Sequence, residues 1–165
     1  MLLVIHDIQD IICSSRGKIA HQINNELLFA YWNIGKKIFE FQQKLNGQAD
    51  EEPKTLMEIS KSLTRDFGAG FSVSNLRLMR RFYLAYPQQQ TLSVSLSWSH
   101  YCELLTISDP DRRSFYEKES VTANWSVREL KRQIESSLFE RLILSKGEVN
   151  KEKVLSLALK GNEIS

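Results

Sequence analysis

Hydrophobic residues recur every three or four positions over the first 45 residues, which predicts one long helix over residues 2–45. From Leu27 onward the spacing is 4-3-4-3-4, typical of a seam between packed helices. The residues of this pattern are Ile5, Ile8, Ile12, Ile19, Ile23, Leu27, Tyr31, Ile34, Ile38, Phe41 and Leu45. At about 1.5 Å per residue the helix would span roughly 60 Å, more than the width of a compact domain of this size. We therefore expect its first half to pack against a second copy of the chain. Two shorter helices, broken at Ser14–Gly17, are the alternative.

The next apolar pattern predicts a helix, a tight turn and a second helix over residues 54–86. Gly68 and Gly70 can adopt the left-handed angles that end a helix. Ser72 can cap the second helix, with Phe71 and Leu76 placed as a hydrophobic staple. Pro87 stops it. The residues expected to be buried are Leu56, Ile59, Leu63, Phe67, Leu76, Met79, Tyr83 and Tyr86.

Beyond Pro87 the pattern changes from strand-like to helical. Leu92, Val94 and Leu96 alternate with small polar residues, which predicts a short strand over residues 92–96 where a winged helix would place its wing. Helices are predicted over residues 98–107, after the cap Asp109, and from a capping box at 126–129 to Gly147. Residues 148–165 read as a tail or linker with a possible short helix at 151–159. The expected fold class is mainly α, with helices over residues 1–147.

Positive charge is concentrated in the helix, turn and helix predicted over residues 54–86, which make a helix-turn-helix candidate. The whole chain has a formal charge of +2, yet residues 61–86 hold five basic residues against one acidic residue, a local charge of +4 that leaves −2 for the rest. A local basic face is what a nucleic-acid contact requires. The candidate DNA-binding residues are Asn75, Arg77, Arg80, Arg81, Lys61, Arg65 and, beside Trp98, His100. An ordinary helical corner with a solvated basic face is the alternative.

Other chemistry is weakly represented. Pro110-Asp111 and Glu129-Leu130-Lys131 match the letters of the PD…ExK nuclease pattern, but both pieces fall at predicted helix starts, where acidic residues serve as caps. The three histidines and two cysteines lack ligand spacing, so we expect no metal site and no cofactor. No stretch approaches the roughly 20 apolar residues of a membrane span, and reduced thiols in a cytoplasmic protein are expected.

Three ordered motifs resemble the N-terminal domain of the YhcG-type bacterial proteins over roughly residues 5–145. The first runs from Leu27 to Lys36, and the second joins Gly70-Phe71-Ser72 to Met79-Arg80-Arg81-Phe82. The third begins at Trp98-Ser99-His100-Tyr101, continues through Trp125-Ser126, and ends at Leu138-Phe139-Glu140-Arg141. The resemblance implies a helical, winged-helix-like DNA-binding module, normally followed by a PD-(D/E)XK nuclease domain. This chain ends about where that domain would begin, so no nuclease residue can be carried onto it.

Two functions follow as expectations. The first is a non-catalytic DNA-binding and assembly domain of a nuclease-type protein, dimeric through the N-terminal helix. The second is a protein–protein module that dimerises or binds another subunit or a nuclease domain without touching DNA.

Overall fold

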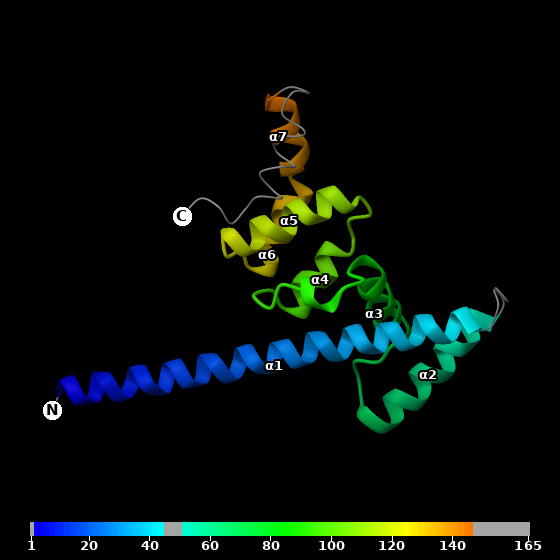
Figure 1. Cartoon of the computed structure of the whole chain (residues 1–165), viewed down its shortest axis with the longest axis horizontal. Helices are drawn as coiled ribbons and strands as arrows, with labels where there is room; N and C mark the ends of the chain where they lie inside the picture. Colours follow the sequence, from blue (N-terminus) through cyan, green and yellow to red (C-terminus); the bar gives the residue numbers. More distant parts are fainter. Residues whose placement is uncertain (1, 45–50, 147–165) are drawn as a thin grey trace. The chain divides into compact units, whose positions relative to one another are not determined.

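The computed structural model describes residues 2–44 and 51–146, and in these ranges it contains α-helices, one short 3-10 helix and no strand. The mainly helical class is therefore confirmed. The chain divides into two compact units, Met1–Ser97 and Trp98–Ser165 (Figure 1). In the described part no helix is both long and apolar enough to cross a membrane.

The first unit is built on one uninterrupted helix, α1 (Leu2–Lys44), drawn in blue to cyan in Figure 1. The alternative of two shorter helices broken near Gly17 is wrong: the helix is continuous through Gly17, which has open space around it. Every residue from Val4 to Ile23 is exposed. Asn24, about halfway along the helix, donates hydrogen bonds to a later segment of the unit, so packing begins there.

The core of this unit lies between the second half of α1 and α3 (Val73–Ala85). Gly35 stands where the two backbones meet: a Cβ there would overlap the carbonyl of Met79. Trp32 donates its indole N–H to the Tyr86 carbonyl at 2.7 Å and meets Tyr83 edge to face at 5.1 Å between ring centroids. The other buried side chains of this contact are Leu28, Ile38, Leu76, Met79 and Phe82.

The predicted seam on α1 is only partly buried within this unit. Of its members, Ile38 is buried, whereas Leu27 is 40% and Phe41 47% exposed. The buried face instead runs through Leu28, Trp32 and Gly35. The close approach at Gly35 selects this face, because only a residue without a side chain lets α3 reach the α1 backbone.

The second helix of this unit, α2 (Glu51–Phe67), buries Leu56, but the prediction that Phe67 is buried is wrong. Phe67 is 72% exposed, and its ring meets Phe71 at 6.2 Å across the turn. The turn forms as expected, since Gly68 and Gly70 have φ of 85° and 133°. The cap Ser72 is confirmed: its hydroxyl accepts the Asn75 N–H.

The strand predicted over residues 92–96 is wrong. The segment contains a 3-10 helix, η1 (Gln89–Thr91), followed by turns. Leu92 and Leu96 are buried, so the alternation of apolar and polar residues indicates correctly which side chains are buried but not the backbone conformation. Asn24 of α1 donates to the carbonyls of Val94 and Leu96, at 3.3 and 2.9 Å. A side chain, rather than a neighbouring strand, thus satisfies the backbone here, and the expected wing is not formed.

The second unit contains α4 (Trp98–Leu104), α5 (Pro110–Thr122), α6 (Val127–Glu135) and α7 (Leu138–Lys146). Asp109 caps α5 and Ser126 caps α6, as predicted. The buried side chains include Tyr101, Leu104, Leu105, Phe115, Tyr116, Leu130 and Phe139.

The single helix predicted from residue 126 to Gly147 is wrong, because it breaks between α6 and α7. Ser137 has φ of 54°, and buried Tyr116 lies at the break. The Tyr116 hydroxyl donates to the Gln133 carbonyl and accepts the Phe139 N–H, both at 3.2 Å. The Tyr116 hydroxyl thus bonds a carbonyl and an N–H that lack a helical backbone partner because the helix is interrupted. The predictions for Gly147 and for residues 148–165 concern residues outside those that the structure describes.

We predict that Gly35→Ala destabilises the chain although alanine favours helix. The overlap with the Met79 carbonyl must be relieved by moving α3, and such overpacking costs about 1–3 kcal/mol. Gly17→Ala is the matched control, since nothing lies within 4 Å of its Cβ and the helix gains about 0.5–1 kcal/mol. Urea unfolding should show a lower midpoint for Gly35→Ala alone. Equal midpoints for Gly35→Ala and wild type would contradict the proposed role of this contact.

Candidate nucleic-acid interface

The outer face of α3 carries arginines opposite its buried side. Arg77 and Arg81 are exposed, whereas Leu76, Met79 and Phe82 pack into the core. Arg80 differs, because it is half-buried and its guanidinium donates to the Gln42 side chain at 2.7 Å. This bond ties α3 to α1. The structure therefore separates the predicted arginine face into two outward side chains and one that also holds the fold.

Asn75 lies in the first turn of α3 and takes part in the turn before it. Its side-chain amide donates to the Gly70 carbonyl at 3.0 Å, and its backbone N–H donates to Ser72 at 3.2 Å. These two bonds hold the entry to α3. A helix N-terminus with its first residues so ordered can present a side chain to a groove in a fixed direction.

The two candidate DNA-binding residues of α2, Lys61 and Arg65, are exposed, and Arg65 is paired. Arg65 donates from Nε to Asp66 at 2.8 Å, so the adjacent carboxylate offsets part of its charge. Lys61 lies one turn earlier on the same helix. The α2 residues belong to the same compact unit as Arg77 and Arg81, because α2 packs against α3.

His100 lies in the second unit, on α4. One ring nitrogen is 2.9 Å from the Trp125 carbonyl, and the residue is half-buried. The contact links α4 to the segment that precedes α6. In this arrangement His100 serves the packing of its own unit.

The residues matching the nuclease letters occupy helix starts. Asp111 is in the first turn of α5, where its N–H donates to the Asp109 cap at 2.9 Å. Glu129 accepts from Arg132 at 2.6 Å and from Gln133 at 2.7 Å, and the hydrogen bond from Arg132 lowers the pKa of Glu129. Its backbone N–H bonds Ser126, which gives one half of the predicted capping box. In the described residues these groups lie on helices, not on a β-hairpin.

Nucleophilic and metal chemistry has little support in the described part of the chain. No group of three His, Cys, Asp or Glu residues gathers there in a way that could hold a metal ion. Burial, with a smaller effect of the Glu103 carboxylate, raises the pKa of Cys102 to about 11. That thiol is protonated near neutral pH and is therefore a poor nucleophile. Cys13 is exposed on α1.

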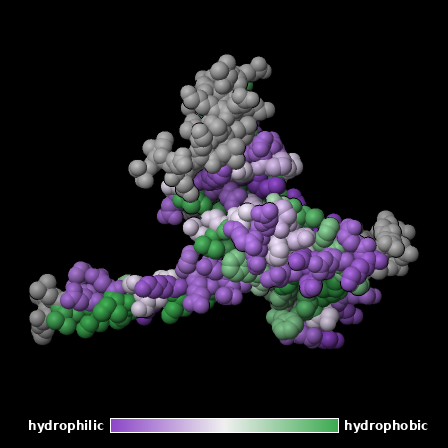
Figure 2. Space-filling view, in the orientation of Figure 1, coloured by the Kyte–Doolittle hydropathy of each residue, from purple (hydrophilic) through white to green (hydrophobic). Residues whose placement is uncertain are grey.

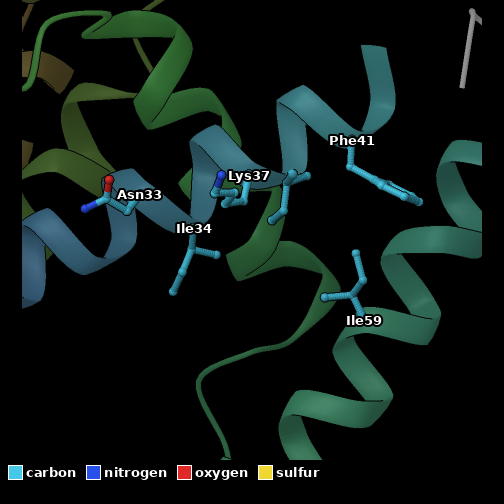
Figure 3. A pocket seen from close by; sticks show the side chains of 6 residues that line it. Asn33, Ile34, Lys37, Phe41 and Ile59 are labelled. Atoms are coloured by element: carbon cyan, nitrogen blue, oxygen red, sulfur yellow. The ribbon is translucent and has the colours of Figure 1, made fainter. Parts of the chain in front are cut away.

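A second surface is apolar. Ile34, Ile38 and Phe41 of α1 and Ile59 of α2 line a hollow of about 340 Å³, bordered by Asn33 and Lys37. Figure 3 shows Phe41 and Ile59 projecting into the space between the two helices. Figure 2 shows hydrophobic residues continuing along the N-terminal half of α1. Ile34, Ile38 and Phe41 belong to the seam predicted from the 4-3-4-3-4 spacing, whereas the hollow itself was not predicted from the sequence.

Comparison with known proteins places the chain in a family. The profile of the DUF1016 N-terminal domain matches residues 7–141. The chain is also 34% identical to "Putative nuclease YhcG" of Escherichia coli (strain K12), over an alignment of 174 positions that covers 86% of this chain and 46% of that protein. The chain thus spans just under half the length of this relative. The comparison with solved structures found no match. The ordered motifs noted in the sequence and the match over residues 7–141 agree: the chain belongs to the DUF1016 N-terminal domain family.

Proposed function

We propose that this chain is a non-catalytic DNA-binding and assembly domain of a PD-(D/E)XK nuclease-type protein. The observation that carries the DNA part is the outer face of α3, where Arg77 and Arg81 are exposed on a capped helix that follows a two-glycine turn. The relative named as a nuclease supports the assignment to nuclease-type proteins.

In this proposal α2, the turn and α3 act as a helix-turn-helix, with α3 as the recognition helix. Arg77 and Arg81 contact phosphates, and Lys61 and Arg65 add to the positive field. Arg80 keeps its bond to Gln42 and holds α3 in place. Asn75, in the first turn, lies nearest the base edges, because recognition helices present their N-terminal residues to bases.

A second candidate function is assembly without DNA contact. It is favoured by the exposed isoleucines of α1: Ile5, Ile8 and Ile12 are 46%, 50% and 44% exposed. Burying one such side chain contributes roughly 1.5–3 kcal/mol relative to full exposure, and contiguous apolar surface marks an interaction site. In this candidate the helix binds a second copy of the chain.

We predict that the double variant Arg77→Ala/Arg81→Ala binds duplex DNA more weakly and with a smaller salt dependence. Each lost phosphate contact lowers the slope of log K against log salt by about 1, so a decrease of about 2 is expected. Titration of labelled duplex at several salt concentrations measures this slope. Arg80 is left unchanged because its substitution would also break the bond to Gln42.

The control is Arg128→Ala/Lys131→Ala, which removes the same charge from two exposed positions of α6. It should bind as wild type does. Equal weakening by both double variants would mean that net charge, not the α3 face, sets affinity. No effect from the α3 variant would contradict the proposed interface.

We predict that the purified chain does not cleave DNA in the presence of Mg²⁺ or Mn²⁺. Glu129→Gln should have little effect on folding, because the cap bond to Ser126 comes from the backbone N–H and glutamine can still accept from Arg132. A plasmid-nicking assay measures cleavage. Cleavage that Glu129→Gln abolishes without unfolding the protein would show that the PD…ExK letters form a site.

We predict that the intact chain is a dimer and that deletion of residues 1–16 weakens the association. The deletion removes Ile5, Ile8 and Ile12 but no core residue, since all described side chains in this part of α1 are exposed. Light scattering at tens of micromolar gives the mass of each form. A monomeric intact chain would refute assembly through α1, as would a dimer that the deletion leaves equally strong.

A further inference from the structure

The exposed apolar residues of α1 form a stripe that runs most of the length of the helix. Between 40% and 63% of each of its large side chains is exposed at Ile5, Ile8, Ile12, Ile19, Ile23, Leu27 and Phe41. Ile34 is half-buried and Ile38 forms the buried floor of the hollow beside α2. Isoleucines at 12, 23 and 34 are eleven residues apart, a period that keeps a stripe nearly straight along an α-helix.

The positions of this stripe are symmetric about Ile23. Ile19 and Leu27 lie four residues to either side, Ile12 and Ile34 eleven, Ile8 and Ile38 fifteen, and Ile5 and Phe41 eighteen. A two-fold axis perpendicular to a helix places each residue at the height of its mirror position in the partner. Two antiparallel copies of α1 would therefore set apolar residues opposite apolar residues at these nine positions.

We propose that two copies of this chain pair through α1 in antiparallel orientation, with Ile23 on the two-fold axis. The inference rests on the assembly part of the proposed function and is independent of DNA binding. It names the occupant of the hollow between α1 and α2: the N-terminal isoleucines of the other copy, which reach the height of Ile34, Ile38 and Phe41.

Charge along α1 favours the same orientation. The first twelve residues of the chain hold Asp7 and Asp10 and no lysine or arginine, whereas Lys36, Lys37 and Lys44 outnumber Glu40 near the other end. Antiparallel pairing brings the acidic end of one helix to the basic end of the other. A parallel pair would place like charges together at both ends, which is unfavourable.

The one charged residue within the stripe also fits the pairing. Arg16 continues the series of Ile5, Leu27 and Ile38 at eleven-residue intervals, and its mirror position is Ala30. The small alanine side chain leaves room for the arginine stem to cross the partner helix while its guanidinium stays in water. Arg16 therefore faces a small side chain in the partner rather than a large apolar one.

Cysteine cross-linking tests the axis directly. In a Cys13→Ser background, Ile23→Cys should give a covalent dimer as the main product of mild oxidation, because a residue on the axis meets its own copy. His21→Cys is the matched control: it is exposed and two residues away but lies off the stripe, so it should stay largely unlinked. The Cys13→Ser parent, which retains half-buried Cys102, should also stay unlinked.

The orientation is tested with mirror positions. Ile12→Cys alone should stay unlinked, and so should Ile34→Cys alone, whereas a mixture of the two should give the mixed disulfide. Self-linking of Ile12→Cys as efficient as that of Ile23→Cys would indicate parallel chains and overturn the proposal. Light scattering on the same samples separates the two inferences: a dimer without the expected cross-links overturns only the antiparallel arrangement, and a monomer overturns assembly as well.

A substitution on the axis gives an independent measurement. Ile23→Asp places two carboxylates next to each other in the dimer and should raise the dimer dissociation constant at least tenfold. His21→Asp introduces the same charge off the stripe and should change it far less. Because Ile23 and His21 are both exposed, neither variant disturbs the core, which circular dichroism can verify. Equal association of Ile23→Asp and wild type would overturn the proposal.

Discussion

The first unit depends on one close approach of two backbones. At Gly35 the chain of α1 comes so near the Met79 carbonyl of α3 that no side chain fits between them. Leu28, Trp32 and Ile38 pack around this point, and the indole bond to the Tyr86 carbonyl fixes the end of α3. The direction of the outer face of α3 follows from this contact, since the rotation of a helix is set by the side it buries.

Helix α1 has two apolar faces that differ in burial. One is short, contains the only glycine in the packed half of the helix, and is buried within the unit. The other is long and exposed, and it extends past the point where tertiary contacts begin at Asn24. A helix whose apolar surface exceeds what its own unit can cover needs another partner, which is the physical basis for proposing assembly.

The arginine face shows how packing and surface chemistry divide along one helix. Arg77 and Arg81 are exposed, while Arg80 reaches back to Gln42 of α1. Arg80, one of the three arginines predicted to contact DNA, thus holds α3 in position for the proposed interface. Asn75 likewise holds the turn through Gly70. A rigid entry and a rigid helix lower the entropy lost on binding, which suits recognition of an extended ligand.

Local signals in the sequence determined the helices, their caps and the turn. Ser72, Asp109 and Ser126 cap helices where they were predicted, and the two glycines at 68 and 70 adopt positive φ, because these features depend on residues within one turn. The family resemblance was also readable from ordered motifs and agrees with the match over residues 7–141. The candidate DNA-binding residues came from local charge and from position in the sequence, and their role remains a prediction.

Tertiary structure decided which apolar face is buried and where regular structure stops. Periodicity gives the spacing of a stripe but not its partner, so it does not show that Leu28 and Trp32 are buried within the unit while Leu27 and Phe41 stay exposed. The segment near Val94, predicted as a strand, forms a turn. The Val94 carbonyl accepts a hydrogen bond from the side chain of Asn24, which lies seventy residues earlier in the sequence. The helix predicted through Ser137 is interrupted there, and the hydroxyl of buried Tyr116 from α5 bonds the backbone on both sides of the interruption. In each case a residue distant in sequence supplies the hydrogen bond or the close contact, and a local pattern carries no information about it.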